Sequence, residues 1–262
     1  MDAGGPSQHD RKGLAAAFGA YIIWGFLPLY LILVQTVPAF EFVGWRIIWT
    51  LPLCLLIALF RKQGGELRAA LGNRRTVGWL ALSASLIAVN WVVYVWAIQT
   101  GEVYAASLGY YINPLVNVLL GTALLGERLT RPQWLAVGIA AVGVSLLAAG
   151  AVTTLWISLT LALTFGTYGL IRKRVVVGSV PGLTIESLLL LLPSIGVVWY
   201  YAQTQGSSFA VSTELSLSIM LGGVLTAVPL LMFAIAARKL PYSMLGFIQF
   251  LAPSIVFILG LT

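Results

Sequence analysis

Residues 104–143 read YAASLGYYINPLVNVLLGTALLGERLTRPQWLAVGIAAVG. The run 104–125 carries no charge and is long enough to cross a bilayer, since a helix of about 20 residues with a rise of about 1.5 Å each spans the hydrocarbon core. A short charged loop at 126–131 separates this run from a second apolar one. Asn113 and Asn117 lie inside the first run, where polar side chains cost free energy in lipid and therefore indicate a packing or functional role.

The composition of the whole chain agrees with a membrane protein. Hydrophobic residues make up 60% of the chain and charged residues 9%, whereas a soluble domain is about 25% charged. We therefore predict an all-α polytopic membrane protein that lies in the lipid bilayer.

The same composition argues against several kinds of chemistry. One histidine, His9, and one cysteine, Cys54, are too few for a His/Cys metal site or a His-based catalytic triad. The sequence contains no nucleotide-binding P-loop and no Gly-x-Ser-x-Gly motif. We therefore predict no metal, no cofactor and no enzyme activity, and an intramembrane enzyme is the least favoured alternative.

Runs with little or no charge predict nine transmembrane helices. Residues 1–12 are polar, and we expect them to form a disordered cytoplasmic tail. The predicted helices cover 14–36, 41–60, 77–99, 104–125, 132–149, 154–171, 183–202, 214–237 and 241–261.

The basic residues predict the orientation. Of the 15 Lys and Arg residues, all but Arg46 fall at alternate ends of the predicted helices and therefore on one membrane face. Because cytoplasmic loops carry an excess of Lys and Arg, we predict a multi-pass protein of the plasma or inner membrane with a cytoplasmic N-terminus. This placement also explains the net charge of +7 without nucleic-acid binding. The residues on this face are Arg11, Lys12, Arg61, Lys62, Arg68, Arg74, Arg75, Arg128, Arg131, Arg172, Lys173, Arg174, Arg238 and Lys239.

The second half of the chain partly repeats the first. Residues 97–114 align with 234–253 after one slip of two residues. We interpret this as two five-helix repeats, 13–150 and 151–262, which have opposite orientations because five is odd. Inverted repeats are typical of secondary transporters, whose substrate site lies between the repeats near the midplane.

The second predicted repeat contains four helices rather than five. Leu259-Gly260 aligns with Leu120-Gly121, after which the first repeat continues through a loop into its fifth helix. We expect a tenth helix that this chain lacks through truncation. The alternative is a nine-helix variant whose C-terminus lies outside.

Several motifs resemble a known transporter family. Asn113-Pro114 followed by Gly126-Glu127-Arg128-Leu129-Thr130 resembles the EamA domain of the drug/metabolite transporter superfamily, and residues 13–262 look most like its RarD-type permeases. The motifs behind the second likeness are Trp24-Gly25-x-x-Pro28-Leu29-Tyr30, Glu41-x-x-x-x-Arg46, Asn90-Trp91-x-x-Tyr94-x-Trp96-Ala97, LGYYINPL at 108–115, and Pro181-Gly182-Leu183-Thr184-x-Glu186. The resemblance implies ten helices, two cytoplasmic termini, and export or exchange of small metabolites or drugs.

The predicted function is therefore secondary transport of a small metabolite or drug-like solute by alternating access. A channel-like facilitator and a non-transporting membrane scaffold are the alternatives. The predicted partners are the small-molecule substrate and the lipid bilayer, and a homodimer remains open.

Polar and aromatic side chains inside the spans are the candidate substrate-binding residues. Asn113 and Asn117 lie one turn apart on one helix face, and they either join helices by hydrogen bonds or line the substrate cavity. The family resemblance places Asn90, Tyr94 and Asn113 around that cavity. The candidate set is Trp24, Asn90, Trp91, Tyr94, Tyr110, Asn113, Asn117 and Tyr168, with Tyr111 as a further aromatic wall.

Three charged residues also have alternative interpretations. Arg46 lies inside its helix and is either a functional cation or one whose side chain extends to the outer interface. Glu186, near the cytoplasmic end of its helix, either forms a structural ion pair with the cations at 172–174 or couples transport to protons. Glu127 lies in the loop 126–131, where we expect a structural role.

Overall fold

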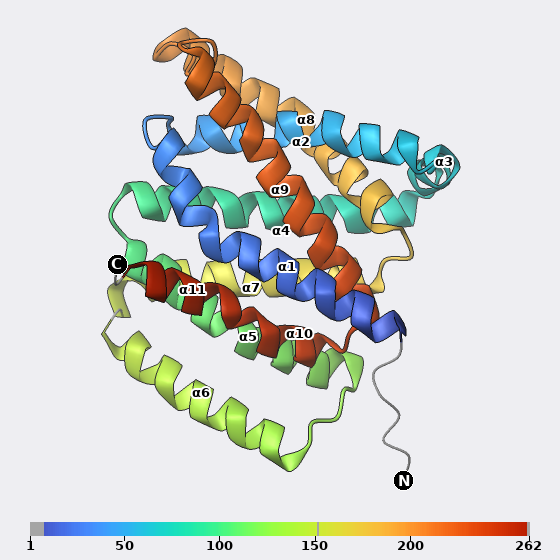
Figure 1. Cartoon of the computed structure of the whole chain (residues 1–262), viewed down its shortest axis with the longest axis vertical. Helices are drawn as coiled ribbons and strands as arrows, with labels where there is room; N and C mark the ends of the chain where they lie inside the picture. The colour runs from blue at the N-terminus through green and yellow to red at the C-terminus, as the bar shows by residue number, and fades with distance from the viewer. Residues whose placement is uncertain (1–7, 151, 261–262) are drawn as a thin grey trace.

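The computed structural model describes residues 8–150 and 152–260, and every regular element in these ranges is a helix (Figure 1). The elements are α1 (Gln8–Leu31), the 3-10 helix η1 (Ile32–Val34), α2 (Ala39–Phe60), α3 (Gly64–Gly72), α4 (Arg74–Gln99), α5 (Val103–Leu125), α6 (Arg131–Ala149), the 3-10 helix η2 (Val152–Thr154), α7 (Leu155–Arg174), α8 (Ser179–Thr204), α9 (Thr213–Lys239), α10 (Tyr242–Gln249) and α11 (Leu251–Gly260).

Eight of the described helices are long and apolar enough to cross a membrane, judged by length and composition. They correspond to the first eight predicted spans, so the prediction of an all-α polytopic membrane protein is confirmed. These helices are α1, α2, α4, α5, α6, α7, α8 and α9.

The ninth predicted span, 241–261, is not one continuous helix. It divides at Phe250 into α10 and α11, which have 8 and 10 residues. Pro253 explains the division, because proline has no N–H to donate to the carbonyl of Gln249 four residues earlier. Residues 261–262 lie outside the described residues.

Two further differences concern polar segments. α3 forms inside the basic loop between the second and third predicted spans, where no helix was expected; Ala70 packs there with Val177 and Ile185. The start of α1 at Gln8 extends the helix into the segment 1–12, for which a disordered tail was expected. Residues 1–7 of that segment lie outside the described residues.

The long helices pack in pairs that join the two halves of the chain. α1 lies against α9, α4 lies against α7, and α2 packs on both α8 and α9 (Figure 1). α5 packs on α7 and α10. α6 lies at the margin of the bundle beside α5, and none of its side chains is buried. α6 therefore takes no part in the buried core of the bundle.

The bundle has two distinct ends. At the basic end α1 begins, α3 lies, and α7 and α9 finish with Arg172–Arg174 and Arg238–Lys239. The opposite end carries the α1–α2 and α4–α5 connections, at 32–38 and 100–102. The N-terminal part of α1 and α3 lie at one side of Figure 1 and the end of α11 lies at the other.

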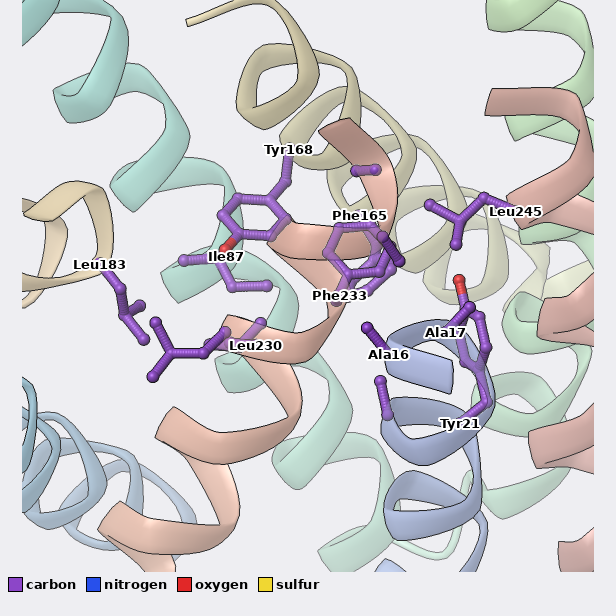
Figure 2. Close-up of a cluster of buried hydrophobic side chains, with 14 of the residues drawn as sticks. Ala16, Ala17, Tyr21, Ile87, Phe165, Tyr168, Leu183, Leu230, Phe233 and Leu245 are labelled. Carbon is purple, nitrogen blue, oxygen red and sulfur yellow. The ribbon is translucent and has the colours of Figure 1, made fainter. Parts of the chain in front are cut away.

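A cluster of aromatic rings holds α1, α7 and α9 together (Figure 2). Phe233 of α9 has its ring centroid 5.0 Å from that of Phe165 and 6.1 Å from that of Tyr168, both on α7. Tyr21 and Trp24 of α1 complete the cluster, at 6.5 Å and 5.8 Å from Phe233. Three of these rings, those of Tyr21, Trp24 and Phe165, also border the site described below.

Candidate functional site

A cavity of about 400 Å³ opens at the end of the bundle opposite the basic end. Gln35 beyond η1 and Val103 at the start of α5 line its outer part. Four aromatic side chains from α1, α4 and α5 form much of its wall: Trp24, Tyr94, Tyr110 and Tyr111. Ala252 and Pro253 of α11 complete the lining, so the divided ninth segment contributes directly to the cavity.

A smaller cavity of about 40 Å³, called the narrow extension below, borders this cavity and lies among more deeply buried residues. The two spaces share Trp24, Tyr94 and Tyr110 as lining residues. The extension adds polar groups that the wide part lacks, namely those of Arg46, Asn90 and Gln249, together with the indole of Trp91. The cavity is therefore apolar and aromatic at its mouth and polar at its base.

Arg46 of α2 lies at this polar base and is 4% exposed. Its Nε donates a hydrogen bond of 2.8 Å to Oγ1 of Thr226 on α9. The guanidinium carbon lies 5.1 Å from the ring centroid of Trp91 and 5.5 Å from that of Phe42. This interior position agrees with a functional or packing role and not with a side chain that extends to the membrane interface.

Asn90 both joins helices and lines the cavity. Its Nδ2 donates to the carbonyl of Leu161 at 2.9 Å and to Oγ1 of Thr164 at 3.0 Å, both on α7. The two interpretations that the sequence leaves open for such asparagines therefore coexist in one residue.

The other two candidate asparagines do not line either part of the cavity. Asn117 of α5 is fully buried, and its Nδ2 donates to Oε1 of Gln249 on α10 at 2.7 Å. Asn113 is 2% exposed, and its Oδ1 has no hydrogen-bond partner among the described residues. Asn117 reaches the cavity only through Gln249, which lines the narrow extension.

Tyr168 belongs to the aromatic cluster and not to the lining. Its ring stacks on Phe233, with an interplanar angle of 18°, and Figure 2 shows it in the buried cluster with Phe165 and Phe233. Among the eight candidate substrate-binding residues, the structure thus brings five together at the cavity: Trp24, Asn90, Trp91, Tyr94 and Tyr110.

Glu186 forms an interior ion pair at the basic end. Its Oε1 accepts a hydrogen bond of 2.5 Å from Oγ of Ser83 and lies 3.6 Å from Nη1 of Arg172. Glu186 and Arg172 are each 1% exposed, so neither side chain reaches the interface. The predicted partner among the cations at 172–174 is therefore Arg172, and the pair lies apart from the cavity lining.

Hydrogen bonds of Glu127 and Lys173 join neighbouring elements at the basic end. Glu127, in the loop after α5, accepts hydrogen bonds from the backbone N–H groups of Tyr242 at 2.6 Å and Ser243 at 2.8 Å, at the start of α10. Lys173 of α7 donates to the carbonyls of Ala237 at 2.9 Å and Leu240 at 2.5 Å. These contacts support the structural role expected of Glu127.

The surroundings of Glu127 favour its ionised form. Partial burial raises the pKa of its carboxyl group, but hydrogen bonds from Ser243 and Tyr242 and the charge of Lys173 lower it. The net result is a pKa below the ordinary value of a glutamate. The cap on α10 is therefore charged at neutral pH and complements the positive N-terminal end of that helix.

Among the polar residues at the site that the sequence analysis did not select are Thr226 and Gln249. Both are polar residues in long apolar runs, and this is the same signal that selected Asn113 and Asn117. A search of every span for polar residues would have selected both. It would not have shown that Thr226 pairs with Arg46 and Gln249 with Asn117, because each pair is more than a hundred residues apart in the chain.

Comparison with known proteins agrees with this architecture. The pattern of the EamA-like transporter family matches residues 11–149. Protein RarD of Streptomyces exfoliatus is 43% identical over 254 residues, covering 97% of this chain and 81% of that protein. An uncharacterized transporter of Pseudomonas aeruginosa is 45% identical over 249 residues, covering 94% of this chain and 83% of that protein. A solved crystal structure at 20% identity covers 95% of this chain and 89% of its own, with a TM-score of 0.73, and supports the fold alone.

The helical bundle, its membrane-length spans and these relatives define a multi-pass membrane transporter rather than an enzyme. The chain belongs to the EamA-like transporter family, and its similarity to RarD proteins places it among the RarD-type permeases.

Proposed function

We propose that the protein is a secondary transporter that carries a small amphipathic solute across the plasma or inner membrane by alternating access. The observation that carries the proposal is a cavity that reaches the middle of the bundle from one end, while Glu127 and Lys173 hold the other end closed. A carrier needs such a one-sided opening at any moment, whereas an open channel needs a continuous passage.

The positive-inside rule orients this cavity. Because the basic end carries the Lys and Arg residues, we place it in the cytoplasm together with the N-terminus. The cavity then opens outward, and closure of its mouth with opening of the Glu127–Lys173 end would expose it to the cytoplasm. Export and exchange both use these two states.

The helix packing supports the proposed inverted repeat. If α1, α2, α4 and α5 correspond to α7, α8, α9 and the α10–α11 segment, the pair α1–α9 corresponds to the pair α7–α4. The pair α5–α7 likewise corresponds to the contact of α11 with α1. Equivalent helices thus have equivalent neighbours, as expected for two related halves around one central site.

The lining supports a solute with an aromatic or apolar body. Cavities that bind small molecules measure about 300–1,000 Å³ and combine apolar walls with a few polar groups, and the volume of about 400 Å³ falls within this range. Trp24, Tyr94 and Tyr110 would pack on the body of the solute, and Asn90 and Gln249 would bind a polar group at its end.

Reconstitution tests the proposal. The purified chain in liposomes should show saturable uptake of some member of a panel of small aromatic and apolar solutes, and unlabelled solute inside the vesicles should accelerate uptake of labelled solute from outside. Repeating the assay with and without a proton gradient shows whether protons drive the transport. Unsaturable flux without counterflow would indicate a channel, and no flux of any solute would indicate a scaffold.

A further inference from the structure

We propose that Arg46 anchors an acidic group of the solute, so that the cavity binds a small organic monoanion: one carboxylate on an aromatic or apolar body. The proposal that the anion binds is argued from the position and contacts of Arg46 alone. The transport of that anion rests on the function proposed above.

Among the residues that the structure describes, no carboxylate pairs with the positive charge of Arg46. Its side chain is buried, and none of the described carboxylates lies within ion-pair distance of it. Glu186 pairs with Arg172, and Glu41, which lies on the same helix as Arg46, binds the backbone N–H and hydroxyl of Ser208. Burial of a charge without a partner is strongly unfavourable, so we expect such a charge to meet a partner at some point in the transport cycle.

The aromatic neighbours compensate this charge only in part. Trp91 and Phe42 lie within cation–π distance of the guanidinium, and such contacts are weaker than an ion pair with a buried carboxylate. They also restrict the position of the guanidinium, whose planar form can donate two parallel hydrogen bonds to a carboxylate. The rings therefore orient the cation without neutralising it.

The donors of Arg46 that could bind an anion are free. Thr226 takes the Nε–H, and neither Nη atom has a hydrogen-bond partner among the described residues. Arg46 also borders the narrow extension, together with the amide-bearing side chains of Asn90 and Gln249. A carboxylate entering from the wide cavity would meet the guanidinium at the end of its path.

The charge of the lining restricts the solute to one negative charge. Among the described residues, Arg46 is the one Lys or Arg that lines either part of the cavity, and no Asp or Glu lines it. A phosphate dianion would leave one negative charge uncompensated in a buried site. A zwitterionic amino acid would leave its ammonium group without a carboxylate partner, so a plain monocarboxylate fits the lining best.

The binding test compares three compounds that share one skeleton. Isothermal titration of the full chain in detergent would use 3-phenylpropanoate, its neutral amide and the zwitterion phenylalanine, with branched aliphatic acids as a second series. We expect the acids to bind at least about tenfold more tightly than the amide and the zwitterion, as a charge-assisted pair predicts. Equal binding of acid and amide, or no binding of any acid in either series, would overturn the proposal.

Variants of Arg46 separate an anion site from a structural cation. Arg46→Gln should weaken binding of the acid roughly 10- to 100-fold while leaving that of the amide unchanged, and Arg46→Lys should lie between. The control, Arg128→Gln, removes an exposed cation at the basic end and should change neither affinity. Without ligand, Arg46→Gln should melt at or above the temperature of the wild type, because it removes an uncompensated buried charge. A lower melting temperature, with acid and amide affected alike, would mean that Arg46 is structural.

Flux measurements distinguish this proposal from the general one. If acids bind through Arg46 but no solute crosses the membrane, the proposed anion site is supported and the proposed transport function is refuted. If neutral solutes show counterflow while acids neither bind nor compete with them, the proposed transport function is supported and the proposed anion site is refuted.

Discussion

The three candidate asparagines have different roles, which depend on the neighbours that each side chain contacts. Asn90 points its amide at α7 and also borders the cavity, whereas Asn117 bonds to Gln249. Asn113, one turn from Asn117, does not line the cavity, and no donor among the described residues gives a hydrogen bond to its buried Oδ1. Residue type alone does not separate these cases.

A pair of alanine substitutions tests which asparagine serves the site. The sequence-based hypothesis expects Asn113→Ala to abolish transport, whereas the lining geometry expects Asn90→Ala to do so. Hydrogen bonds between membrane helices contribute about 0.6 kcal/mol each, so both variants should fold. We expect Asn90→Ala to reduce solute uptake in proteoliposomes at least about tenfold and Asn113→Ala to retain most of it. The reverse order of activity would refute the geometric assignment.

Helix ends and helix contacts determine how the elements come together. Glu127 caps α10 from a distant loop, and Glu66 of α3 caps α8 by accepting from the N–H of Gly178 at 2.6 Å. In both cases a carboxylate outside the apolar runs fixes the start of a membrane helix. The basic end is therefore held by caps as well as by apolar packing.

The charge of the Glu127 cap predicts a dependence on pH. Its pKa is lower in the folded protein than the ordinary value of about 4.3. The resulting stabilisation is fully present above the unfolded pKa and is lost as pH falls through the folded one. Glu127→Gln should therefore lower the melting temperature in detergent at pH 7, consistent with loss of a cap contributing about 1 kcal/mol. The difference from the wild type should shrink below about pH 4, and a difference that is constant with pH would contradict the cap.

Close contact between α9 and α2 predicts a strict requirement for glycine. A Cβ on Gly223 would lie 2.6 Å from the backbone carbon of Trp49, so the helices cannot keep their spacing. Gly223→Val should destabilise the protein by about 1–3 kcal/mol, as overpacking does, and should shift its thermal unfolding to lower temperature. Gly196→Val on α8 is the control, because nothing lies within 4 Å of the added Cβ there. Equal melting temperatures for the two variants would show that α2 and α9 do not pack this closely.

On the scale of the whole molecule, the cations gather at one end of the bundle and the cavity opens at the other. The central cavity is reached from the end with the α1–α2 connection, and the cations surround the start of α1 and the ends of α7 and α9. Orientation in the membrane therefore decides which compartment supplies the solute to this state.

Cysteine labelling in intact cells tests the orientation. Cys54 is buried, so new cysteines at exposed positions can be labelled selectively. Gln205→Cys, beyond the end of α8, should react with a membrane-impermeant thiol reagent, whereas Gly72→Cys at the end of α3 should react only after the cells are permeabilised. Labelling of Gly72→Cys alone in intact cells would reverse the proposed topology.

Sequence alone predicted the number and approximate position of the first eight spans and the basic end of the bundle. Apolar length and loop charge are properties of each segment, and the membrane acts on each segment separately. The tertiary structure decided the rest: the division of the ninth segment at Phe250, the choice of Asn90 over Asn113 at the cavity, and the isolation of Arg46. These features depend on which distant side chains meet, as Arg46 meets Thr226 and Asn117 meets Gln249, and no local pattern of hydropathy or charge encodes such a meeting.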